Sequence, residues 1–432
     1  MATETLTPSI AGDLPMLPKG WTFEPLKNLV DADRGICYGI VQPGADDPDG
    51  VPIVRVNNIR NARLTLDDAM RVSPHIEAKY RRSRLVGGEV LLSLVGSLGE
   101  TAIVPPELAG WNVARAVGVI PVLDEYGGRW VHLCLRSPLL QHCIRTWATT
   151  TVQATLNLGD VARLPIPVPP PTQRSAIAGV LGALDDKIEV NRRMARTLEA
   201  AARALFESWF VRFERARSNG AAPRFVDSPT GAIPEGWTVR PLDSIARFLN
   251  GLALQKFPPK EGEPTLPVIK IAQLRKGDTV GADQANTEIA DDYVVGDGDM
   301  LFSWSGSLEC VLWTGGPGAL NQHLFKVTST EFPRWFLYLW VQHHLPEFRH
   351  IAAAKATTMG HIQRHHLTQA LVVVPPAAVL AEMDRTLGPM VDAIPQRLIQ
   401  ARTLAEARDA LLPRLISGEL EAPKALLKEA TR

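Results

Sequence analysis

Clusters of cations and amides are the residues of this chain whose types and spacing best suit a chemical task. The segment KYRRSR, residues 79–84, holds four cations and one aromatic ring within six residues. Such a segment can neutralise phosphates and can direct an arginine to the edge of a guanine. Its other interpretation is a solubilising surface loop. The candidate nucleic-acid contacts here are Lys79, Tyr80, Arg81, Arg82 and Arg84.

Amide and basic side chains also occur near the ends of two mainly apolar segments, VPIVRVNNI at 51–59 and LPVIKIAQL at 266–274. Both segments are predicted to be strands. Amides just beyond such a strand can pair with adenine, although ordinary turn chemistry explains them equally well. Different side chains at matching positions are what two readers of different sequences would show. The candidates in and just after the first segment are Asn57, Asn58 and Arg60, and those in and just after the second are Lys270, Gln273, Arg275 and Lys276.

Glycine loops and hydroxyl-rich segments supply a third, weaker group of candidates. SLVGSLG and SWSGSLE place small polar residues and one tryptophan at glycine loops, and TTTVQATL and KATTMGHI precede equivalent predicted strands. Small hydroxyls can hold phosphates, whereas the tryptophan suits a core equally well. The candidates are Ser97, Trp304, Ser307, Gln153, Lys355, Thr358 and His361.

Catalytic and metal-binding patterns are poor by comparison. The loose carboxylate group of Glu77 with Asp67 and Asp68 resembles a nuclease site less than a solvated surface segment. His361 and His365 have helical spacing, but no carboxylate or cysteine lies near them in the sequence, so a metal site is not expected. The chain has no GxxxxGK[ST] motif. We therefore expect no catalytic residue, metal or cofactor in this chain.

The elements that position these residues occur twice. LPKGWT begins at Leu17 and IPEGWT begins at Ile233, 216 residues later. GGEVLLSLVGSL from Gly87 matches GDGDMLFSWSGSL from Gly296, and both predict a tight turn, a buried strand and a glycine loop. LPIPVPP and ALVVVPP close the two copies at an offset of 206. The drift in offset indicates one scaffold with loops of different length.

A long amphipathic helix is predicted after each double proline. The first has a heptad seam with a polar position, Asn191, that could fix its register. The second seam is interrupted by Arg397 and Arg408, and Pro389, Pro395 and Pro413 are expected to kink or break it. The seam residues are Leu181, Leu184, Ile188, Asn191, Ala195, Leu198, Ala202, Leu205 and Trp209, then Leu387, Met390, Ile394, Ala401, Leu404, Leu411 and Leu415.

Bulk properties agree with two domains. A chain of 432 residues exceeds the size of a typical single core. No apolar run approaches the ~18 residues of a membrane span, and no export signal is visible at the start, so a cytoplasmic protein is expected. The 46 basic and 46 acidic residues give no net charge. This balance argues against a protein that holds nucleic acid alone by bulk electrostatics.

The predicted fold class is α+β, with two similar α/β domains separated by two long antiparallel coiled-coil helices in a pseudo-two-fold repeat. A helix of about 40 residues spans roughly 60 Å, so two related domains on such a rod suit the two halves of a DNA site. The predicted boundaries are a first recognition domain at 1–171, a helix at 172–217, a linker at 218–232, a second recognition domain at 233–376, a helix at 377–424 and a tail at 425–432.

This order of motifs resembles the specificity subunit of type I restriction–modification enzymes over nearly the whole chain. The strongest element is the proline run followed by TQRSAIAGVLGALDDKIEVN, which is similar to the central helix of that family. The resemblance implies two target recognition domains that each read half of a bipartite, asymmetric DNA site. It implies two methyltransferase subunits docked on the helices and restriction subunits joined through the complex. S-adenosylmethionine, ATP and Mg²⁺ would belong to those partners.

Two other classes remain open. A stand-alone regulator of paired DNA sites would share the two-domain plan, but the neutral charge fits it less well. A fused restriction–modification enzyme would need cofactor motifs, and the chain also lacks the Asn/Asp-Pro-Pro-aromatic loop of adenine methyltransferases. A DNA-binding subunit of a larger enzyme is the preferred interpretation.

Overall fold

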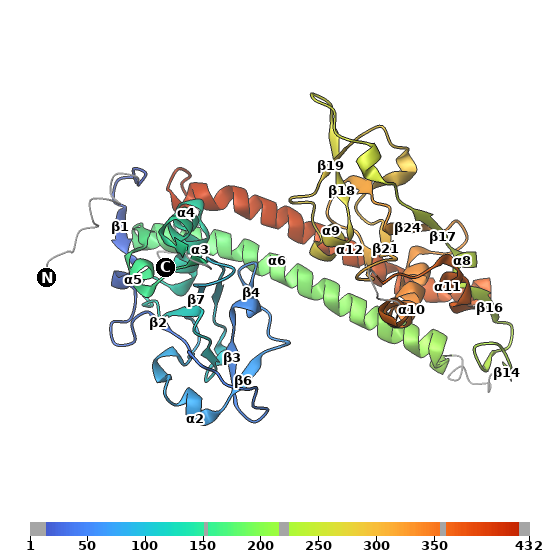
Figure 1. The fold of residues 1–432 in the computed structure, drawn as a ribbon, viewed down its shortest axis with the longest axis horizontal. Helices are drawn as coiled ribbons and strands as arrows, with labels where there is room; N and C mark the ends of the chain where they lie inside the picture. Colours follow the sequence, from blue (N-terminus) through green and yellow to red (C-terminus); the bar gives the residue numbers. More distant parts are fainter. Residues whose placement is uncertain (1–13, 151–153, 216–223, 355–359, 423–432) are drawn as a thin grey trace. The chain divides into compact units, whose positions relative to one another are not determined.

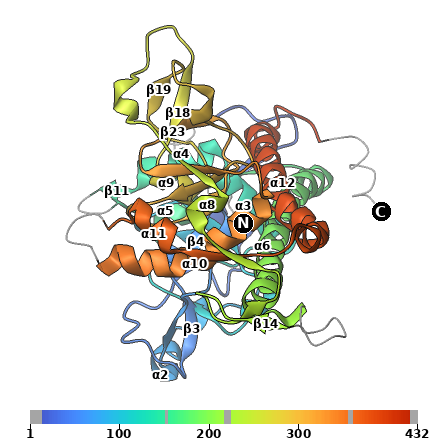
Figure 2. The same cartoon turned by 90° about the vertical axis from the view of Figure 1, so that its right-hand side faces the viewer.

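The computed structural model describes residues 14–150, 154–215, 224–354 and 360–422 (Figures 1 and 2). It has the predicted α+β class. Contacts divide the chain into two compact units, unit 1 (1–186 with 405–432) and unit 2 (187–404). These divisions fall within the two long helices, α6 (Pro171–Phe206) and α12 (Ala377–Ile416), rather than at their ends. Each long helix therefore contributes to the core of both units.

Unit 1 is built on an antiparallel sheet of four strands in the order β2-β10-β7-β8, beside a three-stranded sheet in the order β6-β3-β9. β7 is buried along its whole length, as its apolar run predicts. Its strands are β1 (Thr22–Pro25), β2 (Cys37–Tyr38), β3 (Val51–Val54), β4 (Ile59–Arg60), β5 (Arg63–Leu64), β6 (Met70–Val72), β7 (Val90–Ser93), β8 (Thr101–Ile103), β9 (Asn112–Val113), β10 (Val117–Ile120), β11 (Thr149–Thr150), β12 (Ala154–Thr155) and β13 (Pro165–Val168).

Short helices connect and cover these strands. Ser137 caps α4, with a proline at the first helical position, and Asn157 caps α5. The helices are η1 (Leu26–Leu29), η2 (Val56–Asn58), α2 (Pro74–Glu77), η3 (Arg81–Ser83), η4 (Pro106–Leu108), α3 (Gly128–Arg136), α4 (Pro138–Trp147) and α5 (Leu158–Arg163).

Unit 2 repeats this plan, with four strands in the order β17-β24-β21-β22 and a second sheet in the order β19-β18-β23-β20. The antiparallel pair of β18 and β19 lies in the part of unit 2 that projects from the rest of the unit in both views (Figures 1 and 2). Its strands are β14 (Phe225–Val226), β15 (Ile233–Pro234), β16 (Thr238–Pro241), β17 (Arg247–Asn250), β18 (Thr265–Ile269), β19 (Gln284–Asn286), β20 (Val294–Val295), β21 (Met300–Ser303), β22 (Cys310–Leu312), β23 (Gly318–Leu320), β24 (Leu324–Thr328) and β25 (Leu371–Val374).

The helices of unit 2 follow the same plan, and α10 is its longest domain helix. They are η5 (Glu207–Val211), a π-helical continuation of α6, then α8 (Leu242–Ile245), η6 (Leu254–Lys256), α9 (Ile271–Lys276), η7 (Asp291–Tyr293), α10 (Arg334–Ala354) and α11 (Arg364–Gln369).

The internal repeat is confirmed at the level of strand pairing. β1 pairs antiparallel with β13 and β16 pairs antiparallel with β25, so the motifs that open and close each copy lie side by side. A Cβ on Gly39 would lie 2.0 Å from the backbone oxygen of Val113, and one on Gly251 would lie 2.2 Å from that of Asn321. Each copy therefore needs a glycine where two backbone segments cross.

The predicted strands at 51–59 and 266–274 are shorter than expected. β3 ends at Val54 and β18 ends at Ile269, and each is followed at once by a helical turn, η2 or α9. An amide side chain forms each turn, because Asn58 Oδ1 accepts from the backbone N–H of Arg55 and Gln273 Oε1 accepts from that of Lys270. These local hydrogen bonds compete with the strand ladder.

The expectation that prolines break the second long helix is wrong, because α12 is continuous from Ala377 to Ile416. A proline in a helix interior costs one hydrogen bond, but packing can outweigh that cost. Buried apolar residues flank the prolines: Met383, Leu387, Val391 and Ile394 in unit 2 and Leu412, Leu415 and Ile416 in unit 1.

Each unit has its own core, to which opposite parts of the two long helices contribute. In unit 1 the start of α6 and the end of α12 pack with α3 and α4, and in unit 2 the end of α6 and the start of α12 pack with α10. All four cysteines, Cys37, Cys134, Cys143 and Cys310, are unpaired and buried. No helix within the described ranges is long and apolar enough to cross a membrane.

Candidate nucleic-acid interface

A hairpin with a two-residue turn carries Arg60, one of the exposed candidates of unit 1. Asn61 and Ala62, between β4 and β5, have φ values of 52° and 63°, the conformation of a tight hairpin turn. This conformation is unfavourable for alanine. The turn places Arg60 opposite Arg63, although like charges facing each other across a ladder are destabilising. The tip of this hairpin therefore combines an unfavourable backbone conformation at Ala62 with two arginines.

An open cavity of about 730 Å³ lies beside this hairpin, and it brings together three of the residues predicted from sequence. Asn57, Arg60 and Ser97 line it with Asn61 and Glu100. Two hydrogen bonds of Ser93 fix the loop that carries Ser97, because Ser93 Oγ donates to the Ser97 carbonyl and accepts from the Glu100 N–H. Amide, guanidinium and hydroxyl groups thus converge on one concave surface.

The predicted role of Asn58 is not supported by its contacts. Its side chain is fully buried, and its Nδ2 donates to the Thr65 carbonyl at 2.9 Å and to Asp68 Oδ1 at 2.8 Å. Asn57 Nδ2 also donates to Asp68, at 3.1 Å. Asn58 therefore holds the turn, and Asp68 is engaged in the same network rather than in a nuclease site.

The segment KYRRSR divides into structural and exposed residues. Arg84 pairs through two nitrogens with the buried Glu77, whose pKa is held below its usual value chiefly by that hydrogen bond. Arg82 donates to the backbone carbonyl of Arg34, with Nε at 3.0 Å. Lys79 and Arg81 are exposed. Arg84 and Glu77 thus form a structural pair, whereas Lys79 and Arg81 remain at the surface.

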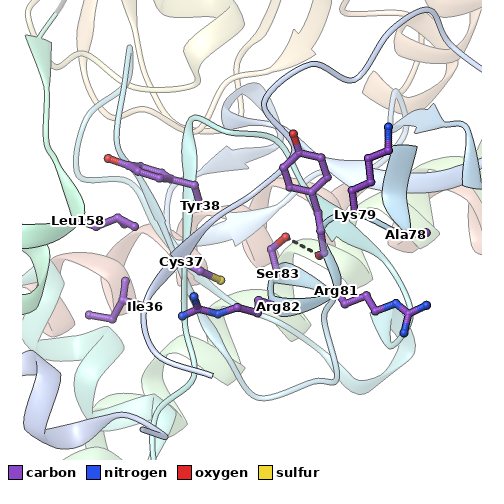
Figure 3. Close-up of a pocket in the computed structure, with 10 residues that line it drawn as sticks. Ile36, Cys37, Tyr38, Ala78, Lys79, Arg81, Arg82, Ser83 and Leu158 are labelled. Carbon is purple, nitrogen blue, oxygen red and sulfur yellow. Dashed lines mark hydrogen bonds between the residues drawn. The ribbon is translucent and has the colours of Figure 1, made fainter. Parts of the chain in front are cut away.

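A second open cavity, of about 480 Å³, is lined by this segment (Figure 3). Figure 3 shows Tyr38 and Leu158 on one side of it and Lys79 and Arg81 on the other. Tyr38 is partly exposed, with 36% of its surface accessible, and was not a candidate from sequence. An aromatic face opposite two cations suits a phosphate with an attached base or sugar. Sequence reasoning missed Tyr38 because the fold, and not the sequence, brings residue 38 to residues 79–82.

In unit 2 the structure gathers Trp304 and His361 around one loop. Trp304 Nε1 donates to Asn250 Oδ1 at 2.9 Å, and its ring lies 5.7 Å from that of His323 and 6.3 Å from that of His361. Ser305 Oγ lies 2.9 Å from His323 Nδ1. Trp304 is half-buried, and its contacts with Asn250, His323 and His361 fix its ring as part of this surface. Ser307 is exposed at the loop tip. His323 and Asn250 lacked any sequence signal.

Two basic residues of the segment at 270–276 are tied to acidic neighbours. Lys270 pairs with Asp283, and Lys276 Nζ lies 3.0 Å from Asp278 Oδ1. Arg275 is exposed on α9, 215 residues after Arg60. Arg60 and Arg275 are thus both exposed and hold matching positions in the repeated sequence, although Arg60 lies in β4 and Arg275 in α9.

Three predicted residues, Gln153, Lys355 and Thr358, lie outside the described residues. Within the described parts of the chain, His, Cys, Asp and Glu side chains form no group of three that could hold a metal ion. Glu77, Asp68 and Lys270 each serve in a local structural pair.

Comparison with known proteins shows which sequences and structures this chain is similar to. Residues 234–382 match the type I restriction modification DNA specificity domain. The chain is 32% identical over 187 residues to the EcoBI specificity subunit of Escherichia coli, which covers 42% of this chain and 39% of that subunit. It is 26% identical over 349 residues to the MjaIX specificity subunit of Methanocaldococcus jannaschii, covering 77% and 78% of the two chains.

Residues 234–382 thus carry a type I restriction modification DNA specificity domain, and both of these relatives are type I specificity subunits. Among solved structures, it is similar to the S subunit of a type I restriction-modification system from M. genitalium, with a TM-score of 0.53 and 14% identity over 93% of this chain and 98% of that one. The structural likeness shows that the fold of specificity subunits is retained despite low sequence identity. The matched domain overlaps the second predicted recognition domain at 233–376.

Proposed function

We propose that this chain is the DNA sequence-specificity subunit of a type I restriction–modification complex. Each recognition domain reads one half of a bipartite, asymmetric DNA site. The observation that carries this proposal is the repeated scaffold: each unit has a four-stranded sheet of equivalent strand order, and the segments that follow β3 and β18 carry different side chains. Identical scaffolds would dock on DNA in the same way, and different side chains would then read different bases.

The positions that correspond between the segments after β3 and β18 divide into those that differ between the two copies and those that are the same. This division suits the reading of two different DNA half-sites. Asn57 and Asn61 of unit 1 correspond to Ala272 and Lys276 of unit 2, so they differ in hydrogen-bonding capacity. Arg60 and Arg275 are the same residue in both copies. Base readout requires differences between the copies, whereas phosphate contact does not. We assign Arg60 and Arg275 to phosphates and the variable neighbours to bases.

The catalytic steps belong to partner subunits in this proposal. The long helices dock two methyltransferase subunits and set the spacing of the half-sites, and restriction subunits join through the complex. S-adenosylmethionine, ATP and Mg²⁺ are held by those partners. The engagement of the carboxylates of Glu77 and Asp68 with Arg84 and Asn58 supports a DNA-reading rather than a catalytic role for this chain.

Exchange of one domain tests the proposal. Replacing residues 17–171 by the equivalent part of a relative should change one half of the methylated motif and leave the other half unchanged. Mapping N6-methyladenine in cells measures the motif. A motif altered in both halves, or in neither while the variant folds, contradicts the assignment.

Gel shifts with and without a co-purified methyltransferase separate this function from a stand-alone regulator. A specificity subunit needs its partner for tight, site-specific binding. A chain that binds its bipartite site equally well alone is a regulator of paired sites.

A further inference from the structure

Each unit contains a joint between its recognition domain and the long helices, and the two joints share an outer part. In unit 1, Arg129 of α3 makes a two-nitrogen ion pair with Asp186 of α6, at 3.1 and 3.3 Å. In unit 2, Arg334 of α10 pairs with Asp392 of α12 at 2.5 Å. The arginines are 205 residues apart and the aspartates 206, so these pairs are equivalent.

Other features of the joints are also repeated. Buried tryptophans follow the two arginines, Trp130 in unit 1 and Trp335 in unit 2. Gly182 and Gly388 lie one turn before the two aspartates, and a Cβ on Gly182 would lie 1.9 Å from the Arg129 guanidinium. Because the arginine–aspartate pairs are alike at both joints, these pairs cannot direct a recognition domain to one joint in preference to the other.

The centre of the unit 1 joint is ionic. Asp185 of α6 accepts from Arg136 of α3 and from Arg408 of α12, both at 2.7 Å. Their side chains are 26%, 12% and 14% exposed in that order. Burial disfavours the charge of Asp185, but the two arginines outweigh it and hold the pKa of Asp185 below its usual value. We call Arg136, Asp185 and Arg408 the ionic joint.

The same three positions in unit 2 are apolar. At an offset of 205 residues, Arg136 corresponds to Val341. At an offset of 206 residues, Asp185 corresponds to Val391 and Arg408 corresponds to Ala202. All three are completely buried in one hydrophobic cluster. One further position follows the trend, since the buried His132 of α3 corresponds to the buried Leu337 of α10. We call Val341, Val391 and Ala202 the apolar joint.

These centres are incompatible with each other. With α3 docked on the apolar joint, Arg136 would be buried without a carboxylate. With α10 docked on the ionic joint, Val341 would replace Arg136 beside Asp185 and leave Arg408 as its only partner. Burial of an unpaired charge is far more costly than loss of an exposed ion pair. Repulsive elements of this kind direct pairing where attractive contacts are alike.

We propose that the ionic and apolar joints form a pairing code that directs each recognition domain to its own end of the helices. The repeated outer contacts hold a domain once it is docked, and the centres decide which domain docks. The code prevents exchange of domains between the joints of one chain or of two chains. It deepens the proposed function, because an asymmetric DNA site can be read only if the two domains keep their places.

The test converts the ionic joint into a copy of the apolar one, with Arg136→Val, Asp185→Val and Arg408→Ala. Asp185→Val alone leaves Arg136 buried without its carboxylate and Arg408 with only the exposed Asp409, and it should lower Tm by roughly 5–10 °C. The triple variant should recover at least the natural Tm, since apolar replacement of a buried ionic triad is often neutral or stabilising. Recovery shows that the triad is not required for folding.

Cross-linking then reports which joint each domain occupies. Cysteines replacing Arg129 and Asp186 report correct docking of α3, and cysteines replacing Arg129 and Asp392 report docking on the other joint. After refolding at raised protein concentration, a short thiol-reactive cross-linker should join 129 to 186 in the natural background. In the triple variant, 129–392 products should appear, within a chain or between two chains as dimers.

A stable triple variant that gives only the 129–186 product overturns the proposal. Should the triple variant fail to fold, the pair His132→Leu and Arg136→Val carries the test, because it keeps the Asp185–Arg408 contact and makes α3 resemble α10. Absence of 129–392 products in that folded variant is equally decisive against the code. Neither readout uses DNA, so a failure here is distinct from failure of the proposed function.

Discussion

At the residue scale, His132 makes the stability of unit 1 depend on pH. It is buried, and burial, followed by the charge of Arg136, lowers its pKa from 6.5 to about 3. Between these values the unfolded chain binds a proton that the folded unit does not, so stability falls as the pH falls. At pH 5 the loss from this residue is about 2 kcal/mol relative to neutral pH.

His132→Leu should therefore reduce the loss of stability between pH 7 and pH 5. Leucine suits the site because Leu337 occupies the equivalent position of unit 2. Urea unfolding at both pH values measures the difference. His142→Leu, at an exposed position of α4, is the matched control and should keep the natural pH dependence. His344 in unit 2, whose pKa is about 4, contributes equally to all variants. Equal losses in the natural and His132→Leu proteins would contradict the assignment.

Arg60 and Arg275 permit a second prediction at this scale. If each contacts one phosphate, replacement by glutamine should weaken binding of the methyltransferase complex to all sequences alike. It should also reduce the slope of log K against log salt by about 1 per residue. Titration of DNA at several salt concentrations measures this slope. A changed methylated motif with an unchanged slope would assign the arginine to base readout.

At the scale of elements, Asn191 is a polar defect in the helix seam. Its side chain is completely buried in unit 2, and neither amide atom has a hydrogen-bond partner among the described residues. Burial of such a group without partners costs about 1–3 kcal/mol. Asn191→Leu should raise the free energy of unfolding by a similar amount, as denaturant titration would show. Asn191→Ala, which removes the amide without filling its volume, should gain less. A loss of stability in the leucine variant would show that the amide is satisfied.

The long helices were predictable because their seams repeat over many turns, and so were the buried strands β7 and β21, where apolar runs follow tight turns. The continuity of α12 was not, since local sequence shows three prolines but not the cores of two units that hold the helix on both sides of them. Arg408 illustrates the same limit. It interrupts the seam in sequence, whereas the fold supplies Asp185 opposite it.

At the scale of the whole molecule, α6 passes from one unit to the other without interruption, so its length should set the spacing of the half-sites. Four residues such as Ala-Glu-Ala-Leu inserted after Arg193 add ~6 Å and ~40° of rotation beyond a full turn. One base pair adds ~3.4 Å and ~35°. The methylated motif should keep both half-sites and gain one or two base pairs of spacer, at some cost in stability because the heptad is shifted. Unchanged spacing in a folded, partner-bound variant would show that the helix does not measure the DNA.

The candidate site was predictable only in part at this scale. The repeat located both recognition surfaces, because divergence between two copies is visible in the sequence. The roles of single residues were not visible, since Asn58 and Arg60 look alike as polar neighbours of one strand. Only the fold shows that Asp68 and Thr65 engage the first and leave the second at the surface. Tyr38 and His323 reach their surfaces through strand pairing between distant segments.

Burial makes the four unpaired cysteines poorly reactive. Burial raises the pKa of every one of these thiols, most strongly at Cys134 and Cys310. The thiolate is the form that reacts with oxidants and alkylating agents, so none of the four reacts readily at neutral pH. Peroxide that inactivates enzymes with exposed thiolates should therefore oxidise these four buried thiols slowly. A single cysteine introduced at the surface would be the one site that takes a fluorescent or spin label, without removal of any natural thiol.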